Sequence, residues 1–290
     1  MAGATQRSEA ATGLALVAPP LVYAVALLAV PMAVIVLFSF WTQDYLDLDT
    51  TLTLDNYREA WTDPIYRELM ARSVYISGVV TLITVVLAFP VAYYISFHVA
   101  PERKALWIFL VTIPFWTSYL VRIFLWKVIL GFNGVLNTSL IGIGLIDAPL
   151  TVILYNLNAV VIALAHAFAP FAILPIFVAL ERIDRSLLEA ARDLGETARS
   201  AFVRVTLPLA MPGVVAASLI VFIPTIGDYI TPRLVGGPGG LMIANMIQTQ
   251  FLRLNNAPMG ATLAVLAMLI VSGIALLFVL ANRRFLKRRG

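Results

Sequence analysis

The chain has 290 residues, of which 61% are hydrophobic and 12% are charged, and its mean hydropathy is +0.92. Soluble domains average about 45–50% apolar and 25% charged residues, so this composition excludes an ordinary soluble protein and indicates one embedded in a lipid bilayer. Cysteine is absent, which excludes disulfides, thiolate metal sites and thiol nucleophiles. The net charge of +4 comes without a basic face interleaved with aromatic residues, so nucleic acid is not an expected partner.

Six stretches are apolar and long enough to cross a bilayer as helices, which takes about 20 residues each. The first stretch is longer than the core of a signal peptide, so we expect it to be retained. The sequence therefore predicts an all-α membrane protein with one transmembrane domain, residues 1–290, whose spans are 14–40, 70–97, 105–126, 151–180, 211–231 and 260–281. Near the end of the third span, Arg122 is expected to extend toward the membrane interface.

Lysine and arginine are distributed unevenly between the two sides of this arrangement. Most of the 20 basic residues fall near the N-terminus, at 103–104, at 182–204 and in the tail 283–289. The first loop on the opposite side is rich in aspartate and glutamate. Because basic loops are retained on the cytoplasmic side, we expect both termini and the segment 186–205 to be cytoplasmic.

The segment 186–205 is polar and charge-rich, and it separates the fourth and fifth spans. Apolar residues recur in its first half at helical spacing. Ser186 can cap this helix, with Glu189 completing a capping box, and Gly195 can supply the positive φ that ends it. The pattern predicts a short amphipathic helix on the membrane surface that stops at a glycine.

A second short helix is expected directly after that glycine. Thr197 can act as its N-cap, and Pro208 and Pro212 are expected to break the chain before the fifth span. Two short amphipathic helices joined at a glycine make a compact element, and small alanine faces allow another protein to approach closely. We interpret the segment as a docking element. An ordinary amphipathic connector is the alternative.

Asp228 is a carboxylate that the sequence places in the outer part of the fifth span, about 25 Å from its cytoplasmic start. Prolines and a glycine around it interrupt helical hydrogen bonding and free carbonyl oxygens, which membranes tolerate in packed or water-lined regions. With Tyr229 beside it, such a carboxylate suits a passing ammonium or guanidinium group. The alternatives are that Asp228 is solvated at a helix end or paired with Arg233.

Trp116 and Tyr119 lie at the outer end of the third span among further aromatic residues. Aromatic side chains there can form an interfacial belt. If they face inward, they can stack on a cation or on alkyl carbons. We therefore consider Trp116, Tyr119, Asp228 and Tyr229 as candidates for a substrate path.

A spaced set of residues in and after the docking segment is the most specific pattern in the chain: Glu189, Ala190, Ala191, Gly195, Val205, Leu207 and Pro208. It resembles the EAA motif of the membrane-spanning subunits of bacterial ABC importers. The resemblance implies a coupling helix that sits in a groove of a cytoplasmic ATPase subunit.

Four further stretches extend the resemblance across nearly the whole chain: 54–57, 114–122, 133–137 and 227–232. They resemble the spermidine/putrescine branch of type I importers, and in it the first of two permeases. The family implies a six-helix MetI-like fold in the bacterial inner membrane, a sister permease, two copies of the ATPase and a periplasmic binding protein. Related importers carry opines, amino-acid-like compounds, phosphonates or iron, so the polyamine is one of several possible solutes.

The residues of this chain offer no energy source or catalytic site of their own. No GxxxxGK[ST] loop occurs, so we expect ATP and Mg to be used by the partner and no cofactor or metal to be bound here. An intramembrane enzyme would need a pattern such as HExxH or GxSxG, and neither is present. A stand-alone secondary transporter would leave the docking segment unexplained.

Overall fold

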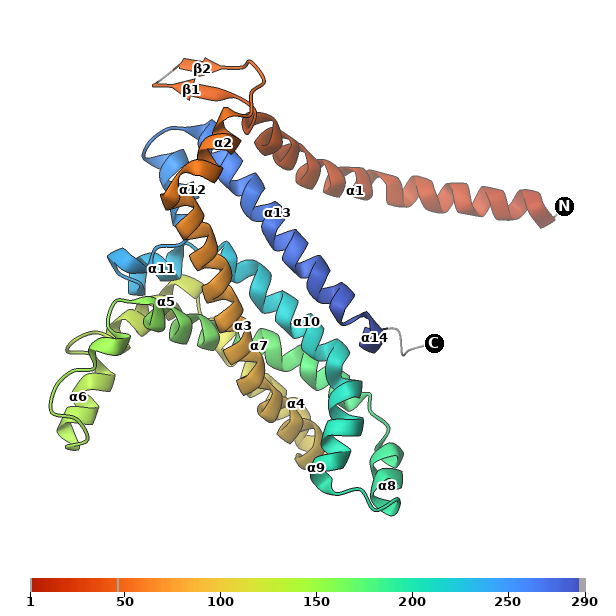
Figure 1. Cartoon of the computed structure of the whole chain (residues 1–290). Helices are drawn as coiled ribbons and strands as arrows, with labels where there is room; N and C mark the ends of the chain where they lie inside the picture. The colour runs from red at the N-terminus through yellow and green to blue at the C-terminus, as the bar shows by residue number, and fades with distance from the viewer. Residues whose placement is uncertain (1, 46, 287–290) are drawn as a thin grey trace.

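The computed structural model describes residues 2–45 and 47–286, with side chains from residue 15 onward, and most of this chain is helical (Figure 1). The long helices are α1 (Ala2–Phe38), α3 (Pro64–His98), α7 (Leu157–Glu181), α10 (Leu207–Ile226) and α13 (Ala257–Ala281). The shorter helices are α2 (Asp55–Thr62), α4 (Pro101–Thr112), α5 (Tyr119–Ile129), α6 (Val135–Gly142), α8 (Arg185–Asp193), α9 (Ala198–Ala201), α11 (Ile230–Val235), α12 (Ile243–Leu252) and α14 (Arg283–Leu286). The remaining elements are the antiparallel strands β1 (Thr42–Asp44) and β2 (Asp47–Asp49), the 3₁₀ turns η1 (Ile113–Trp116), η2 (Thr151–Ile153) and η4 (Pro238–Gly240), and the π-helical turn η3 (Phe202–Thr206).

Helices α3, α7 and α10 form the centre of the bundle, and each contributes fully buried aliphatic side chains, for example Val80, Leu164 and Val221. Helices α7 and α10 approach most closely at Gly213. A Cβ atom built on Gly213 would lie 2.5 Å from the Cβ of Ala179 and 2.5 Å from a backbone carbonyl of α7. Glycine is therefore required here for packing, since any larger residue would push the two helices apart.

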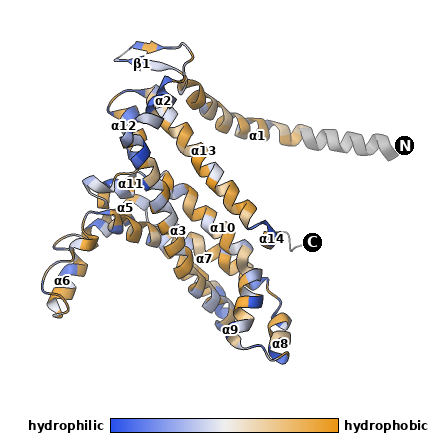
Figure 2. Ribbon diagram, viewed as in Figure 1, coloured by the Kyte–Doolittle hydropathy of each residue, from blue (hydrophilic) through white to orange (hydrophobic). Residues whose placement is uncertain are grey.

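Helix α13 packs against α12 and the outer half of α3, and Met259 and Leu263 of α13 are buried there. Helix α1 contacts α13 only near its C-terminal end and otherwise projects away from the bundle (Figure 1). None of the most apolar 18-residue window of α1 is buried. The long helices are apolar along their lengths, whereas α8, α14 and the hairpin are polar (Figure 2).

Within the described residues, five helices are long and apolar enough to cross a membrane, and a bent pair makes a sixth span. The predicted fold class, an all-α membrane protein with six spans, is confirmed. The first, second and sixth predicted spans correspond to α1, α3 and α13. The fourth span begins six residues later than predicted, at Leu157, because Thr151–Ile153 forms a 3₁₀ turn and Asn156 caps the helix.

The prediction of one continuous third helix over 105–126 is wrong. Helices α4 and α5 meet at an angle of 86°. Pro114 lies in the 3₁₀ turn between them and has no amide to donate, and Thr117 and Ser118 then adopt extended backbone. The apolar composition runs through this break without interruption, so hydropathy alone does not reveal it.

The prediction that Pro208 and Pro212 break the chain before the fifth span is also wrong. The span runs without interruption from Ala198 to Ile226, so the expected second short helix is its first turn. The backbone amide of Leu207 donates five residues back to Phe202, and this wide turn precedes the prolines. Proline is tolerated in a first turn, where its missing amide has no required partner. The span ends at Ile226 instead of residue 231, which leaves Asp228 outside the helix.

Candidate functional site

Helix α8 begins at a cap different from the one predicted. The carboxylate of Asp184 accepts a hydrogen bond of 3.0 Å from the backbone amide of Ser186, so Asp184 is the N-cap and Ser186 lies inside the helix. The same amide, together with the Ser186 hydroxyl, holds the pKa of Asp184 below its usual range. The expected capping box between Ser186 and Glu189 is absent from this described segment, and α8 starts one turn closer to α7.

Gly195 ends α8 as predicted, and its geometry explains why glycine stands there. Its φ is +82°, in the left-handed region that side chains disfavour. The amide of Gly195 donates to the carbonyl of Arg192 at 2.9 Å, and the amide of Glu196 donates to that of Ala191 at 3.0 Å. These two bonds form a Schellman motif, which satisfies the last carbonyls of the helix and turns the chain sharply.

The motif residues of this segment divide into an outward and an inward set. Glu189 and Ala190 are exposed, whereas Ala191 is buried against the following turn. Leu194, next to the glycine, is 86% exposed. A leucine on a polar loop that is this exposed in the isolated chain provides an apolar contact for another protein.

The second half of the motif lies at the start of the fifth span. Val205 belongs to the π-helical turn, and Leu207 and Pro208 form the first turn of α10; all three are half-buried. Thr197 caps this span by accepting from the amide of Ser200, as predicted. The docking segment is thus joined directly to α10, without a flexible break between them.

A polar cluster that the sequence reasoning missed holds α8 against the neighbouring helices. Glu181, the last residue of α7, accepts from Lys104 of α4 at 2.8 Å and from the hydroxyl of Ser96 of α3 at 2.6 Å. Arg185 of α8 donates to the carbonyl of Ser96 at 3.0 Å and lies 3.8 Å above the ring of Phe97. The spacing of Glu181 and Arg185, four residues apart, is the one sequence signal for this cluster.

A second polar cluster forms where the two helix breaks meet. The hydroxyl of Tyr119 donates to Oδ2 of Asp228 at 2.6 Å and lies 2.8 Å from the hydroxyl of Thr231. Oδ1 of Asp228 accepts from the amides of Ile230 and Thr231, which start α11. The two predicted aromatic and acidic candidates therefore belong to one site, although 109 residues separate them in the sequence.

Asp228 matches neither of the alternatives considered for it. Its side chain is only 9% exposed, so it is not solvated at a helix end. Arg233 donates to Gln248 at 3.1 Å instead of pairing with Asp228. Both carboxylate oxygens are occupied, so a cation that bound Asp228 would have to displace or share the Tyr119 hydroxyl.

The other two path candidates lie differently. Trp116 is 78% exposed and packs edge-on against Phe109, with ring centroids 6.0 Å apart. The side chain of Tyr229 is 41% exposed, and its backbone carbonyl accepts from the amide group of Asn245 at 2.7 Å. The structure therefore brings Tyr119 and Asp228 together but keeps Trp116 apart from them.

Arg122 does not extend toward the membrane interface, which corrects the prediction for this residue. It is 8% exposed and turns back over the break between α4 and α5. Its guanidinium donates to the carbonyls of Pro114 and Thr117, the latter at 3.1 Å, and lies 5.5 Å from the ring centre of Phe115. The charge satisfies carbonyls that the break frees, which favours the inward position.

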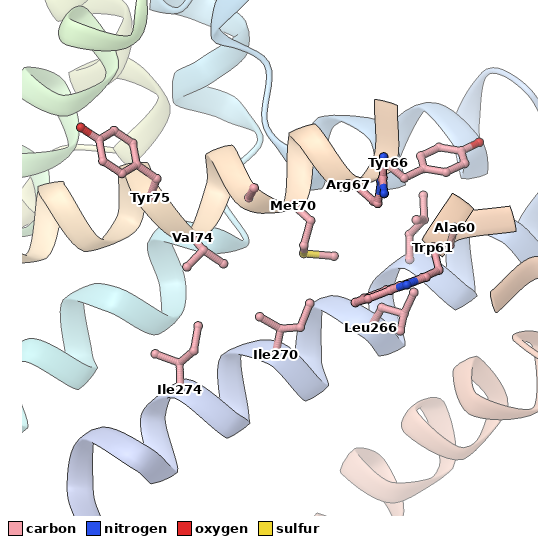
Figure 3. A pocket seen from close by; sticks show the side chains of 12 residues that line it. Ala60, Trp61, Tyr66, Arg67, Met70, Val74, Tyr75, Leu266, Ile270 and Ile274 are labelled. Carbon is pink, nitrogen blue, oxygen red and sulfur yellow. The ribbon is translucent and has the colours of Figure 1, made fainter. Parts of the chain in front are cut away.

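The largest groove among the described residues lies elsewhere, on the side of the bundle between α3 and α13 (Figure 3). It has a volume of about 600 Å³ and is lined mainly by apolar side chains such as Met70, Val74 and Ile270. Arg67 is the one charged residue in its lining. None of the residues of the docking segment or of the Asp228 cluster lines it, so it is a lateral apolar surface and not part of either polar site.

A six-span helical protein with a rigid polar docking segment between its fourth and fifth spans is a membrane-spanning subunit of a transport system. The chain belongs to the family of binding-protein-dependent transport system inner membrane components, whose model matches residues 23–289. It is the permease of a type I ABC importer and a multi-pass protein of the inner membrane.

Curated relatives resemble the chain along most of its length. It is 36% identical over 255 residues to the spermidine/putrescine transport system permease protein PotB of Haemophilus influenzae, covering 88% of each chain. It is 36% identical over 260 residues to PotB of Escherichia coli, covering 89% of this chain and 93% of that one. It is also 35% identical to the inner membrane ABC transporter permease protein YdcU of Escherichia coli, covering 80% and 78%.

Solved structures share the fold at low sequence identity. A chain of the bacterial alginate ABC transporter, in complex with its alginate pentasaccharide-bound periplasmic protein, matches with a TM-score of 0.75 and 17% identity, covering 98% of each chain. A chain of the inward-facing MetNI methionine ABC transporter matches with a TM-score of 0.58 and 19% identity, covering 79% of this chain and 98% of that one. The MetI-like fold that the sequence predicted is thereby confirmed.

Proposed function

We propose that this permease moves a polyamine, spermidine or putrescine, across the inner membrane as part of an ATP-driven importer. The observation that carries the proposal is the rigid segment of α8 and Gly195, which is joined without a break to the fifth span. A docking element of this kind converts the movement of a bound protein into the movement of a membrane helix. The similarity to two PotB proteins along nearly nine-tenths of the chain supports the polyamine as the solute.

The docking segment is proposed to sit in a groove of a cytoplasmic ATPase. Glu189, Ala190 and Leu194 form its exposed face, offering a carboxylate, a small surface for close approach and an apolar anchor. Val205, Leu207 and Pro208 pass the movement of the segment to α10. The basic residues near the segment and in both termini support a cytoplasmic location for all three.

A sister permease is proposed to cover the lateral apolar surfaces of this chain. The apolar window of α1 buries nothing within the described chain, and the groove between α3 and α13 is open and largely apolar. A second helical subunit would pack against these surfaces by van der Waals contact, as membrane helices do. Two permeases present two docking segments, which supports two copies of the ATPase.

The solute is proposed to arrive on a periplasmic binding protein and to pass the Tyr119–Asp228 cluster. A polyamine carries several ammonium groups, and a carboxylate at membrane depth attracts such charges strongly because water screens it little. Tyr229 and Trp116 present exposed aromatic faces near this level, and such faces also attract ammonium groups. We assign the energy source to the partner, since this chain has no phosphate-binding loop, and we infer no cofactor, metal or catalytic site in it.

Another small solute is the second candidate. The chain is 26% identical over 209 residues to a putative 2-aminoethylphosphonate permease of Salmonella typhi, covering 72% of this chain. The higher identity to the PotB proteins and the buried carboxylate of Asp228 favour a cationic solute over an anionic one.

Uptake of radiolabelled spermidine and putrescine into proteoliposomes tests the proposal. The vesicles would contain this permease, its sister, the ATPase and the binding protein, with ATP present on the ATPase side. We expect uptake only when ATP and binding protein are both present. Uptake by the permease alone, without the ATPase, would contradict it and indicate a secondary transporter.

A further inference from the structure

We infer that Glu181 is a positioning residue that joins the docking segment to α4, so that α4 moves with α8 during transport. The inference rests on the proposed docking of α8 to an ATPase. It concerns the Glu181, Lys104 and Arg185 cluster, which the resemblance to importer permeases does not include.

Helix α4 is held to the rest of the chain by unusual means. None of its residues is buried, so side-chain packing within this chain contributes little to its position. Its Lys104 is the exception: the side chain is 18% exposed, and its ammonium lies 2.8 and 3.0 Å from the two oxygens of Glu181. Among the described side-chain hydrogen bonds, this pair is the one that ties α4 to another helix.

Glu181 is tied just as closely to the docking segment. Arg185, in the first turn of α8, lies 3.3 Å from the same oxygen of Glu181 that Lys104 contacts. Arg185 also donates to Ser96 and stacks on Phe97, so the start of α8 is clamped against the end of α3. A displacement of α8 therefore acts on Glu181 directly, and through Lys104 it acts on α4.

The far end of α4 explains why this connection matters for transport. Helix α4 leads into the 86° break, and Tyr119 at the start of α5 holds Asp228 across that break. A shift of α4 changes the break and with it the Tyr119–Asp228 contact. A contiguous set of polar contacts thus connects the docking segment at one end of the molecule with the candidate solute cluster at the other.

A distance measurement tests whether α4 follows α8, and it does not depend on the solute. The chain has no native cysteine, so Leu110→Cys on α4 and Leu194→Cys next to α8 can be spin-labelled specifically on this subunit. In the complete complex we expect one narrow distance distribution between the labels, unchanged on addition of ATP and vanadate. With Lys104→Gln we expect ATP and vanadate to broaden or shift that distribution. The same response in both proteins would overturn the inference.

Coupling gives the second readout. We expect Lys104→Gln and Glu181→Gln to assemble normally with the ATPase but to lower putrescine imported per ATP hydrolysed, by roughly two- to thirtyfold. The double variant should be no worse than either single variant, since both remove one contact, and Lys104→Arg should restore coupling. An unchanged ratio in the single variants, or no rescue by Lys104→Arg, would contradict the inference.

The matched control is Glu68→Gln, which breaks the ion pair with Arg72 at the opposite end of α3. It should leave both readouts at the wild-type value, and a loss equal to that of Glu181→Gln would overturn the assignment. A wild-type complex whose α8 does not contact the ATPase would refute the proposed function itself. A wild-type complex that docks and imports, with Lys104→Gln behaving identically, would refute the inference about Glu181 alone.

Discussion

Tyr119 and Asp228 are joined by a hydrogen bond of 2.6 Å between two breaks in the membrane-spanning helices. Tyr119 begins α5 just after the bend in the third span, and Asp228 follows the end of α10. The tyrosine hydroxyl has a single hydrogen, which it gives to the carboxylate, so the hydroxyl of Thr231 donates to the tyrosine in turn. The cluster fixes the position of the two breaks relative to each other.

Removing the charge of Asp228 is expected to reduce uptake without preventing assembly. Asp228→Asn retains an oxygen that can accept from the amides of α11 but loses its attraction for an ammonium group. Uptake of labelled spermidine should fall at least about tenfold, mainly through a higher KM, because a hydrogen-bonded charge contributes about 1.5–3 kcal/mol. Unchanged kinetics would remove Asp228 from the solute path.

Removing only the hydroxyl of Tyr119 separates the solute contact from the latch. Tyr119→Phe leaves the carboxylate in place, so we expect a decrease in uptake that is smaller than that of Asp228→Asn. Tyr94→Phe is the matched control, since Tyr94 is 50% exposed and its ring stacks on His98. A loss in Tyr119→Phe as large as in Asp228→Asn would show that the two residues act only as a latch.

Gly195→Val is expected to weaken binding of the ATPase while the membrane helices still insert. A side chain at the φ of +82° costs roughly 1–2 kcal/mol, and a β-branched residue costs more, so the turn after α8 would open. The amount of ATPase that co-purifies should fall about tenfold. Gly144→Val is the control, because Gly144 has a φ of +70° and equally open surroundings but lies outside the docking segment. Equal loss in both variants would contradict a docking role for Gly195.

Gly213→Val tests the packing of α7 against α10. The new side chain would overlap Ala179, and overpacking of this kind costs about 1–3 kcal/mol or more. The midpoint of thermal aggregation of the detergent-solubilised permease should fall by several degrees. Gly273→Val, in α13, has no atom within 4 Å of the added Cβ and should leave the midpoint unchanged. A wild-type midpoint for Gly213→Val would mean that the two helices are not in such close contact.

Arg122→Gln should destabilise the bend in the third span. The substitution leaves the carbonyls of Pro114 and Thr117 without their charged donor, at a cost of about 1–3 kcal/mol. We expect lower thermal stability and lower uptake together, measured on the same preparation. Lys127→Gln, on the same helix, is the control. If both variants behave like the wild type, Arg122 does not hold the bend.

The parts of this molecule that the sequence could predict are those that depend on local patterns. Runs of apolar residues located the spans, and the spacing around Gly195 predicted a helix that ends at a positive φ. Both features are set by neighbours within a few residues. The end of the fifth span was misplaced because Thr225–Pro232 remains apolar enough to continue a helix, although Gly227 and Asp228 end it.

The features that the sequence could not predict depend on contacts between distant segments. The third span is apolar throughout, so its bend is visible only once Arg122 turns inward to cap the freed carbonyls. Tyr119 and Asp228 each stood out in the sequence, but nothing local indicates that they meet. Lys104 resembled a topology signal at the membrane edge, and its pairing with Glu181 depends on the packing of α4 against α7.

The most direct test of the account is the ATPase activity of the purified complex in lipid, measured with its binding protein loaded with different solutes. The panel would contain putrescine, spermidine, an amino acid and 2-aminoethylphosphonate. The account predicts that only the putrescine- or spermidine-loaded binding protein stimulates ATP hydrolysis, and that Gly195→Val abolishes this stimulation. Stimulation by another loaded solute alone would contradict the polyamine assignment, and equal hydrolysis with and without loaded binding protein would contradict coupling through α8.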